Sequence, residues 1–303
     1  MSDFLEVDDL TPAEFADVLA RAVAWKREPA TLPRPFDGRG IALLFEKPSA
    51  RTRTSSEMAV VGLGGHPIYL RGEEVGLGAR EAIEDVARTL AAYCAVVAGR
   101  VFDHGTLELM AGAVDIPVVN LLSDRAHPCQ ALADYLTLQE AFGSLEGRRL
   151  VFVGDGNNVA ASLAFGAALS GVELTVASPP GYELDDDVVE RSRNLGGAVE
   201  TTNDPFEAAK GADAIYTDVW TSMGQEEERE ARQAAFAGFQ VTSKLMGAAG
   251  DQAKFLHCLP AHRGEEVAGD VIDGPASLVW QQAGNRMHAM RALLSLLVDG
   301  HDQ

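Results

Sequence analysis

Apolar, β-rich segments alternate with amphipathic segments along almost the whole chain of 303 residues. Helical patterns lie between the apolar segments, for example at residues 81–93, 130–142 and 159–169. The apolar segments are residues 41–45, 67–70, 95–101, 117–122, 150–153, 173–177, 214–217 and 255–259. Because strand and helix take turns, the sequence predicts an α/β fold with parallel sheets flanked by helices on both faces.

A boundary between two similar α/β halves is predicted near residues 142–148, where a long helix ends in glycine and a new strand begins. It divides the chain into residues 1–143 and 144–278. The last helix, about residues 279–298, has apolar side chains at helical spacing. We therefore expect the C-terminal segment, residues 279–303, to pack back on the first half.

Acidic residues outnumber basic ones by 45 to 25, which gives a net charge of −20 and argues against nucleic acid or an anionic membrane as partner. No apolar stretch is long enough to span a bilayer, so neither membrane insertion nor export is expected. Three scattered cysteines do not make a disulfide framework, and a reducing cytoplasm fits best. The acidic excess also suggests a salty cytoplasm, a hypothesis that fails if activity and melting temperature are the same in low and molar salt.

The segment at residues 45–54 follows an apolar strand and opens a helix, and it carries two arginines and three hydroxyls. A helix N-terminus presents backbone N–H groups and about half a positive charge, which favours an anion. Arg51 adds a fork of donors that matches phosphate oxygens two at a time. The alternative is a plain helix cap by Ser49, with both arginines in solvent.

Further polar residues follow other predicted strands. Arg100 ends one strand, and His127 and Gln130 start a helix after another, where both have donors for a carbonyl or phosphoryl oxygen. Asp218 ends a strand of the second half and is suited to an ammonium group. Since ligands bind beyond the carboxyl ends of parallel strands, these residues are site candidates. The plain alternatives are a surface ion pair for Arg100, a cap or core residue for His127, and a small buried thiol for Cys258.

The segment Gly154-Asp155-Gly156-Asn157-Asn158 resembles the start of a dinucleotide-binding loop. The full fingerprint requires another glycine where this chain has Val159, and an acidic residue at the end of the next strand, which is absent from residues 176–179. Nicotinamide chemistry is therefore disfavoured. The asparagines are better explained as amide donors to a small polar substrate.

Four motifs together resemble the aspartate/ornithine transcarbamoylase family, over the chain from about residue 41 to the last helix. They are Phe-Glu-Lys-Pro-Ser-Ala-Arg-Thr-Arg at residues 45–53, His-Pro-Cys-Gln at 127–130, Asp-Val-Trp-Thr-Ser-Met-Gly at 218–224 and His-Cys-Leu-Pro at 257–260. The first two are similar to motifs shared by all transcarbamoylases. The last two are similar to the ornithine type.

The resemblance implies transfer of a carbamoyl group from carbamoyl phosphate to the δ-amine of L-ornithine, which gives L-citrulline and phosphate. It implies a carbamoyl-phosphate-binding domain at residues 1–143, an ornithine-binding domain at residues 144–278, and an active site in the cleft between them. It also implies a homotrimer or a multiple of trimers, with no metal and no organic cofactor.

The resemblance also assigns roles by similarity. The carbamoyl phosphate residues are Ser49, the backbone of Ala50, Arg51, Thr52, Arg100, His127, Gln130, Cys258, Leu259 and Arg286. The ornithine residues are Asn158, Asp218, Ser222 and Met223. The catalytic residues are Arg51, Arg100, His127, Cys258 and Arg286. Arg53 is expected to orient its neighbours through Glu57, one helical turn further on.

Two positions depart from the family pattern. Ala50 stands where the family usually has threonine, and Gly76 stands where a polar side chain commonly reaches the neighbouring subunit's site. Arg71, Glu74 and Arg80 are the candidate substitutes for the latter. The alternatives left open are another amine substrate, such as acetylornithine or putrescine, and a non-catalytic binding paralogue. Asp218 favours a free α-ammonium, and therefore ornithine.

Overall fold

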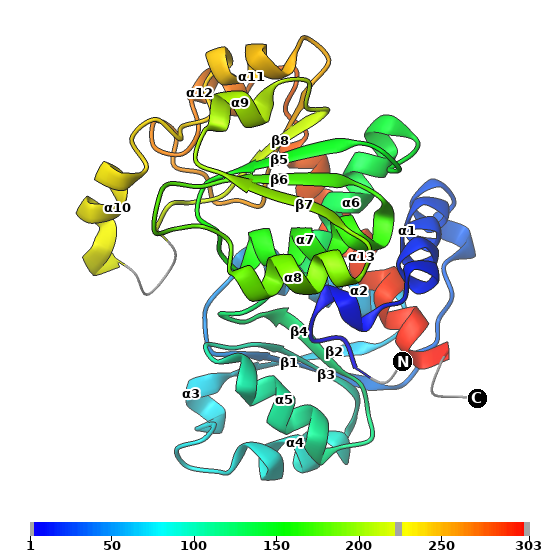
Figure 1. Cartoon of the computed structure of the whole chain (residues 1–303). Helices are drawn as coiled ribbons and strands as arrows, with labels where there is room; N and C mark the ends of the chain where they lie inside the picture. The colour runs from blue at the N-terminus through cyan, green and yellow to red at the C-terminus, as the bar shows by residue number, and fades with distance from the viewer. Residues whose placement is uncertain (1–2, 222–225, 300–303) are drawn as a thin grey trace. The chain divides into compact units, whose positions relative to one another are not determined.

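The computed structural model describes residues 3–221 and 226–299, which form two compact units. Unit 1 comprises residues 1–136 and 284–303, and unit 2 comprises residues 137–283. Each unit is built around its own parallel sheet with helices on both faces (Figure 1). The predicted fold class is confirmed. The functions assigned to the two halves, their boundary and the cleft expected between them stay predictions.

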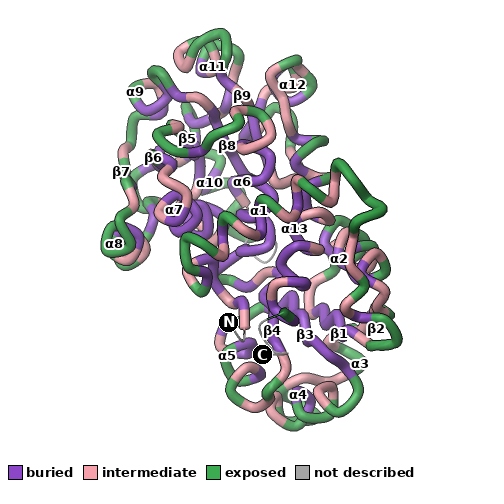
Figure 2. The backbone as a smooth tube through the Cα atoms, turned by 90° about the vertical axis from the view of Figure 1, so that its right-hand side faces the viewer, coloured by how far each residue is buried: buried purple, intermediate pink, exposed green. Residues whose placement is uncertain are grey.

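The sheet of unit 1 has the strand order β2-β1-β3-β4. Its strands are β1 (Gly40–Phe45), β2 (His66–Arg71), β3 (Cys94–Arg100) and β4 (Val118–Leu122). All seven residues of β3 are buried, whereas β2 at the edge is half-buried with exposed ends (Figure 2). Continuous apolarity therefore marks the central strands, and the edge strand is the more polar one.

Helices cover both faces of this sheet (Figure 1). The unit contains α1 (Pro12–Arg27), α2 (Ala50–Gly62), α3 (Gly72–Val75), α4 (Ile83–Ala91), α5 (His104–Ala113), the short 3-10 helices Val7–Asp9 and Pro29–Thr31, and parts of α6 (Pro128–Phe142) and α13 (Val279–Asp299). Ala42 and Leu44 of β1 pack in one core with Val86 of α4 and Leu107 of α5. Alternate residues of a strand point to opposite faces, so every second side chain of β1 faces α4 and α5.

The sheet of unit 2 has the strand order β7-β6-β5-β8-β9. Its strands are β5 (Arg149–Val153), β6 (Glu173–Ala177), β7 (Ala198–Thr202), β8 (Ala214–Thr217) and β9 (Lys254–His257). Its further helices are α7 (Asn158–Ser170), α8 (Asp186–Asn194), α9 (Pro205–Ala209), α10 (Arg229–Ala235), α11 (Ser243–Ala249), α12 (Gly269–Ile272) and the 3-10 helix Glu226–Glu228. Figure 1 shows α7 and α8 on one face of the sheet and α9 and α11 on the other.

Two strand predictions need correction. Strand β7 was not predicted, because Ala198-Val199-Glu200-Thr201-Thr202 is an edge strand with a single buried residue and no apolar run. The strand predicted at residues 255–259 ends at His257, so Cys258 and Leu259 lie in the loop beyond it. In the described part of the chain, no helix is both long enough and apolar enough to cross a membrane.

Candidate active site

The N-terminus of α2 provides the first part of the site, in unit 1. Ser49 is the N-cap, and its Oγ accepts a hydrogen bond from the backbone N of Thr52 at 3.3 Å. The Ser49 hydroxyl also donates to Thr52 Oγ1 at 3.1 Å. Such a cap stabilises a helix by about 1 kcal/mol. It also fixes the first turn of α2, where backbone N–H groups lack acceptors within the helix.

Arg100 and His127 lie at the same end of the sheet in unit 1. Arg100 is the last residue of β3 and pairs in register with Phe45, the last residue of β1, so it stands at the strand edge from which α2 starts. Arg100 and His127 are each 6% exposed. The pKa of His127 lies well below its ordinary value, because burial disfavours the imidazolium and the positive charges of Arg286, Arg100 and Arg51 repel it. His127 is therefore a neutral imidazole at neutral pH.

Arg286 of α13 joins this group from the far end of the sequence. Its Nη1 donates to Gln130 Oε1, and its Nη2 donates to Thr52 Oγ1 at 3.3 Å. Gln130 in turn donates through Nε2 to Asp134 Oδ1 at 2.7 Å. All four side chains are buried. A chain of hydrogen bonds thus runs from α6 through α13 to the first turn of α2.

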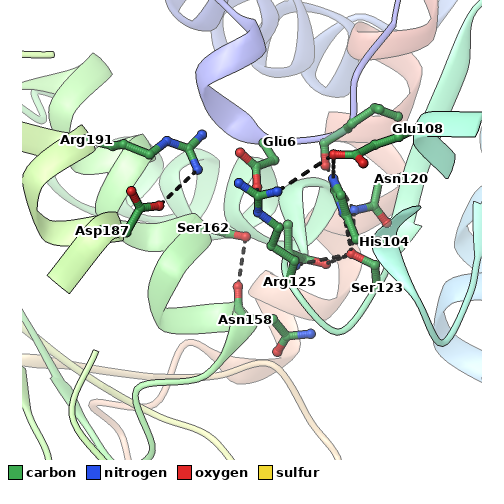
Figure 3. A network of polar contacts seen from close by, with 12 residues as sticks. Glu6, His104, Glu108, Asn120, Ser123, Arg125, Asn158, Ser162, Asp187 and Arg191 are labelled. Carbon is green, nitrogen blue, oxygen red and sulfur yellow. Dashed lines mark hydrogen bonds and ion pairs between the residues drawn. The ribbon is translucent and has the colours of Figure 1, made fainter. Parts of the chain in front are cut away.

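The turn that precedes His127 is held by a buried hydroxyl, Ser123 (Figure 3). Ser123 Oγ accepts from the backbone N of Ala126 at 3.2 Å and from Asn120 Nδ2 at 3.0 Å. It lies 2.8 Å from His104 Nδ1. Since both N–H groups use the oxygen as acceptor, the hydroxyl proton is left for His104 Nδ1 or for the carbonyl oxygen of Ala126, which lies 3.5 Å from Oγ. This arrangement fixes the approach of the chain to His127.

Asp218 is the centre of the candidate site in unit 2. It follows β8 and is 7% exposed. Its carboxylate accepts from Cys258 Sγ at 2.9 Å and from Asn157 Nδ2 at 3.1 Å. Asn157 also caps α7, since its Oδ1 accepts from the backbone N of Val159 at 2.9 Å. The structure thus brings Asp218 and Cys258 together, and it adds Asn157, whose neighbour Asn158 begins α7.

A buried His–Glu pair supports the loop that carries Cys258. His257 Nε2 lies 3.2 Å from Glu266 Oε1, and His257 Nδ1 accepts from the backbone N of Leu259 at 2.9 Å. His257 is therefore the Nε2–H tautomer, which donates to the carboxylate. Leu259 has φ of 62°, a left-handed conformation that is unfavourable for a leucine. The bond to His257 holds this backbone in place.

Arg232 anchors a second carboxylate in unit 2, that of the half-buried Asp155. Its Nη1 donates to Asp155 Oδ2 at 2.7 Å and to the carbonyl oxygen of Trp220 at 3.1 Å. Burial raises the pKa of Asp155, and the bond to Arg232 opposes that rise. Trp220 belongs to the motif at residues 218–224, of which Ser222 and Met223 lie outside the described residues.

Two groups of described side chains have donor atoms close enough for a shared metal ion: Asp218, His257 and Cys258, and His262, Glu265 and Glu266. In the first group, the Cys258 thiol donates to Asp218. In the second, Glu265 is paired with Arg229 at 2.5 Å. The donors of both groups thus serve hydrogen bonds and ion pairs within unit 2.

Comparison with known proteins shows which family the chain belongs to. The carbamoyl-P binding domain of aspartate/ornithine carbamoyltransferases matches residues 2–140, and the Asp/Orn binding domain of the same enzymes matches residues 146–297. The chain belongs to the aspartate/ornithine carbamoyltransferase family. The ornithine carbamoyltransferase of Acidothermus cellulolyticus is 52% identical over 301 residues, which cover 98% of this chain and 96% of that protein.

Two further relatives in this carbamoyltransferase family come from Pyrococcus furiosus. An ornithine carbamoyltransferase named anabolic is 46% identical over 304 residues, covering 98% of this chain and 96% of the relative. A solved structure of ornithine carbamoyltransferase from that organism has a TM-score of 0.94 at 46% identity, covering 99% of this chain and 97% of the other. The transcarbamoylase resemblance and the fold inferred from it are therefore confirmed.

The positions that depart from the carbamoyltransferase pattern have distinct surroundings. Ala50, the first residue of α2, is exposed. Gly76 ends α3 with φ of 68°, and a Cβ built there would lie 2.7 Å from the Cβ of Arg80. This backbone conformation and the close approach both favour glycine. Of the candidate substitutes, Arg71 and Glu74 bond to each other at 3.0 and 2.8 Å.

Arg53 makes the predicted contact with Glu57. Its Nε donates to Glu57 Oε1 at 2.8 Å, one turn along α2. Its guanidinium carbon lies 3.7 Å from the ring centroid of Tyr69. Arg53 thus contacts Glu57 of α2 and Tyr69 of β2. Of the two arginines in the first turn of α2, Arg51 is the one whose charge lowers the pKa of His127.

Proposed function

We propose that this chain transfers the carbamoyl group of carbamoyl phosphate to the δ-amine of L-ornithine, with L-citrulline and phosphate as products. The observation that carries the proposal is the convergence of Arg51, Arg100 and Arg286 on the neutral side chain of His127, beside the N-terminus of a capped helix, in a member of this carbamoyltransferase family. Arg100 and Arg286 are buried and Arg51 is exposed, and guanidinium groups placed in this way suit the doubly charged phosphoryl group of carbamoyl phosphate, a mixed anhydride. They also offset the net charge of −20, which opposes the approach of any anion.

The phosphate is held at the first turn of α2. Ser49, Arg51 and Thr52 donate to its oxygens, and the backbone N–H of Ala50 contributes with the positive end of the helix. Arg286 approaches the same turn through Thr52. As the bond between carbon and the phosphate oxygen breaks, these donors stabilise the departing phosphate.

The carbonyl group is polarised by Arg100, His127 and Gln130. Attack of the δ-amine on the carbonyl carbon places negative charge on the carbonyl oxygen, and fixed donors there stabilise the tetrahedral transition state. Removal of one such donor typically costs about 3 kcal/mol, or a hundredfold or more in rate. Holding both substrates in line contributes further through proximity, and no covalent enzyme intermediate is required.

Ornithine is bound in unit 2. Asp218 pairs with its α-ammonium, and Asn158 supplies an amide to its carboxylate end. Ser222 and Met223 complete this set by family resemblance. Cys258 and Leu259 border the reacting amine, and the hydrogen bond from the Cys258 thiol to Asp218 supports this grouping. The attacking amine must be neutral, so activity rises towards alkaline pH.

The chain associates into a homotrimer or a multiple of trimers. Two surface features of unit 1 support association. Strand β2 is an edge strand, so the backbone N–H and C=O groups on one of its sides have no neighbouring strand in this sheet. Met58 and Val61 of α2 are 46% and 49% exposed, although both are large apolar residues. Sedimentation of the purified chain measures the oligomeric state.

A cytoplasmic role in arginine biosynthesis is the proposed context. All three cysteines are free thiols, as a reducing compartment requires. Burial raises the pKa of Cys129 to about 12, so this thiol is unreactive at neutral pH.

A colorimetric assay for carbamoylated product tests the proposal. Carbamoyl phosphate is supplied with ornithine, acetylornithine, putrescine or aspartate. Ornithine is expected to give the highest kcat/KM. Preference for another amine would refute the substrate assignment, and absence of turnover with every amine would refute the enzymatic function.

A further inference from the structure

Asp134 is a buried carboxylate for which the proposed reaction has no direct use. It lies on α6, one helical turn after Gln130, and is 0% exposed. Its Oδ1 accepts a hydrogen bond from Gln130 Nε2 at 2.7 Å. Burying a carboxylate is costly, so this residue is expected to do more than fill space.

The partner of Asp134 is an amide whose two ends have nearly the same shape and opposite hydrogen-bonding character. Asp134 Oδ1 accepts from the Nε2 end of Gln130 and so selects that end of the amide. The Oε1 end is then turned to Arg286, whose guanidinium only donates. The flipped amide would set oxygen against carboxylate and N–H against guanidinium. Asp134 and Arg286 therefore favour the same one of the two orientations.

This orientation is transmitted to the phosphate-binding turn. Arg286, held by Gln130 through Nη1, donates through Nη2 to Thr52 Oγ1 at 3.3 Å. Thr52 is bonded to the cap residue Ser49. Asp134 thus acts on the first turn of α2 through two intervening side chains.

We propose that Asp134 is a positioning residue for carbamoyl phosphate. It fixes the amide orientation of Gln130, so that the second Nε2 hydrogen remains for the substrate carbonyl and Oε1 keeps Arg286 beside Thr52. This inference rests on the proposed function, because it assigns Gln130 and Arg286 to carbamoyl phosphate.

Two substitutions of different severity test the inference. Asp134→Asn keeps the size of the side chain but offers Gln130 either an oxygen or an NH2 group, so both amide orientations become possible. Asp134→Leu removes the acceptor. We expect the KM for carbamoyl phosphate to rise about tenfold in Asp134→Asn, and kcat/KM to fall about a hundredfold in Asp134→Leu. The KM for ornithine should stay unchanged in both; an equal rise in both KM values would overturn the proposal.

A double-mutant cycle separates positioning from a general structural role. In a Gln130→Leu background, Asp134→Leu should have little further effect on kcat/KM, because Asp134 acts through Gln130. Independent, multiplying effects would refute this route. Thr137→Val, a buried polar substitution on the same helix, is the matched control. It should lower the melting temperature without changing the KM for carbamoyl phosphate.

Calorimetric binding of carbamoyl phosphate without ornithine distinguishes this inference from the proposed function. Weaker binding in Asp134→Asn than in the parent supports positioning even if the chain turns over no amine. If Asp134→Asn and Asp134→Leu both fold and both bind carbamoyl phosphate as tightly as the parent does, the inference is contradicted, even if citrulline is formed.

Discussion

The candidate sites of the two units are buried to a similar degree but have opposite charge. In unit 1, Arg100 and Arg286 are 6% and 7% exposed, and their charges help to lower the pKa of His127. In unit 2, the candidate site contains the carboxylates of Asp218, which is 7% exposed, and of Asp155, which is half-buried and paired with Arg232; burial raises the pKa of Asp155. Burial disfavours the charged form of an acid and of a base alike. This difference agrees with the proposed binding of an anion in unit 1 and of an ammonium group in unit 2.

The largest expected effect comes from removing the buried cation that balances a half-buried acid in unit 2. Arg232→Met leaves Asp155 without its guanidinium partner, which should lower the free energy of unfolding by about 3 to 5 kcal/mol at pH 8. The folded-state pKa of Asp155, already raised by burial, rises further. A carboxyl whose folded pKa exceeds its unfolded value destabilises the fold above that pKa, and the penalty disappears as pH falls through it. Urea unfolding should therefore show a smaller loss at pH 5 than at pH 8.

Arg229→Met is the matched control for that experiment. Arg229 lies on the same helix and pairs with Glu265, but its side chain is 56% exposed. Its loss should cost no more than about 1 kcal/mol. Equal losses for the two variants, or a loss in Arg232→Met that does not depend on pH, would contradict the role given to Asp155.

The next effect concerns the cationic site of unit 1. Arg100→Met should lower kcat about a hundredfold to a thousandfold, because a donor to the developing oxyanion is lost. The pKa of His127 should also move back towards its ordinary value, since one of the charges that lower it is removed. Steady-state kinetics and an NMR titration of the imidazole measure the two effects.

Arg125→Met, which removes an exposed arginine paired with Glu6 at 2.8 Å, serves as the control for Arg100→Met. It should leave kcat and the His127 titration unchanged. If Arg100→Met retained full activity, Arg100 would have no place in the proposed mechanism.

The acidic site of unit 2 should respond in the reciprocal way. Asp218→Asn is expected to raise the KM for ornithine about ten- to a hundredfold, because a hydrogen-bonded partner of the α-ammonium loses its charge. Affinity for carbamoyl phosphate should not change. Asp213→Asn, at the opposite end of β8, is the control, since Asp213 bonds to Arg148 and to the backbone of Arg149. A change in carbamoyl phosphate affinity in Asp218→Asn would mean that the two sites are not independent.

The smallest effect is expected at Ala50. Ala50→Thr adds a hydroxyl at the first residue of α2, where the side chain is exposed, and should lower the KM for carbamoyl phosphate by up to about tenfold. Initial-rate measurements at saturating ornithine suffice. An unchanged or higher KM would show that this position does not contact the phosphate.

The sequence predicted most of the sheet strands because central parallel strands are continuously apolar. Strand β7 was not predicted because it is a polar edge strand without a continuous apolar segment. The rule that ligands bind beyond strand ends located Arg100 and Asp218, and the structure places both at those ends.

The supporting residues could not be predicted in the same way. Arg232 meets Asp155 across 77 positions, and Gln130 meets Arg286 across 156. Neither pair has a local pattern. Glu266 is only nine positions from His257, yet nothing in the sequence distinguishes it from the neighbouring Glu265. Contacts of this kind depend on tertiary packing, whereas strand ends can be read from local composition.

The unequal burial of the three thiols gives the protein a built-in chemical reporter. Cys94 and Cys129 are buried, and burial raises the pKa of both, whereas Cys258 is half-buried beside Asp218. An alkylating reagent applied to the native chain will therefore modify Cys258 first. The rate of that modification, followed by mass spectrometry, should report occupancy of the proposed ornithine site without any measurement of turnover.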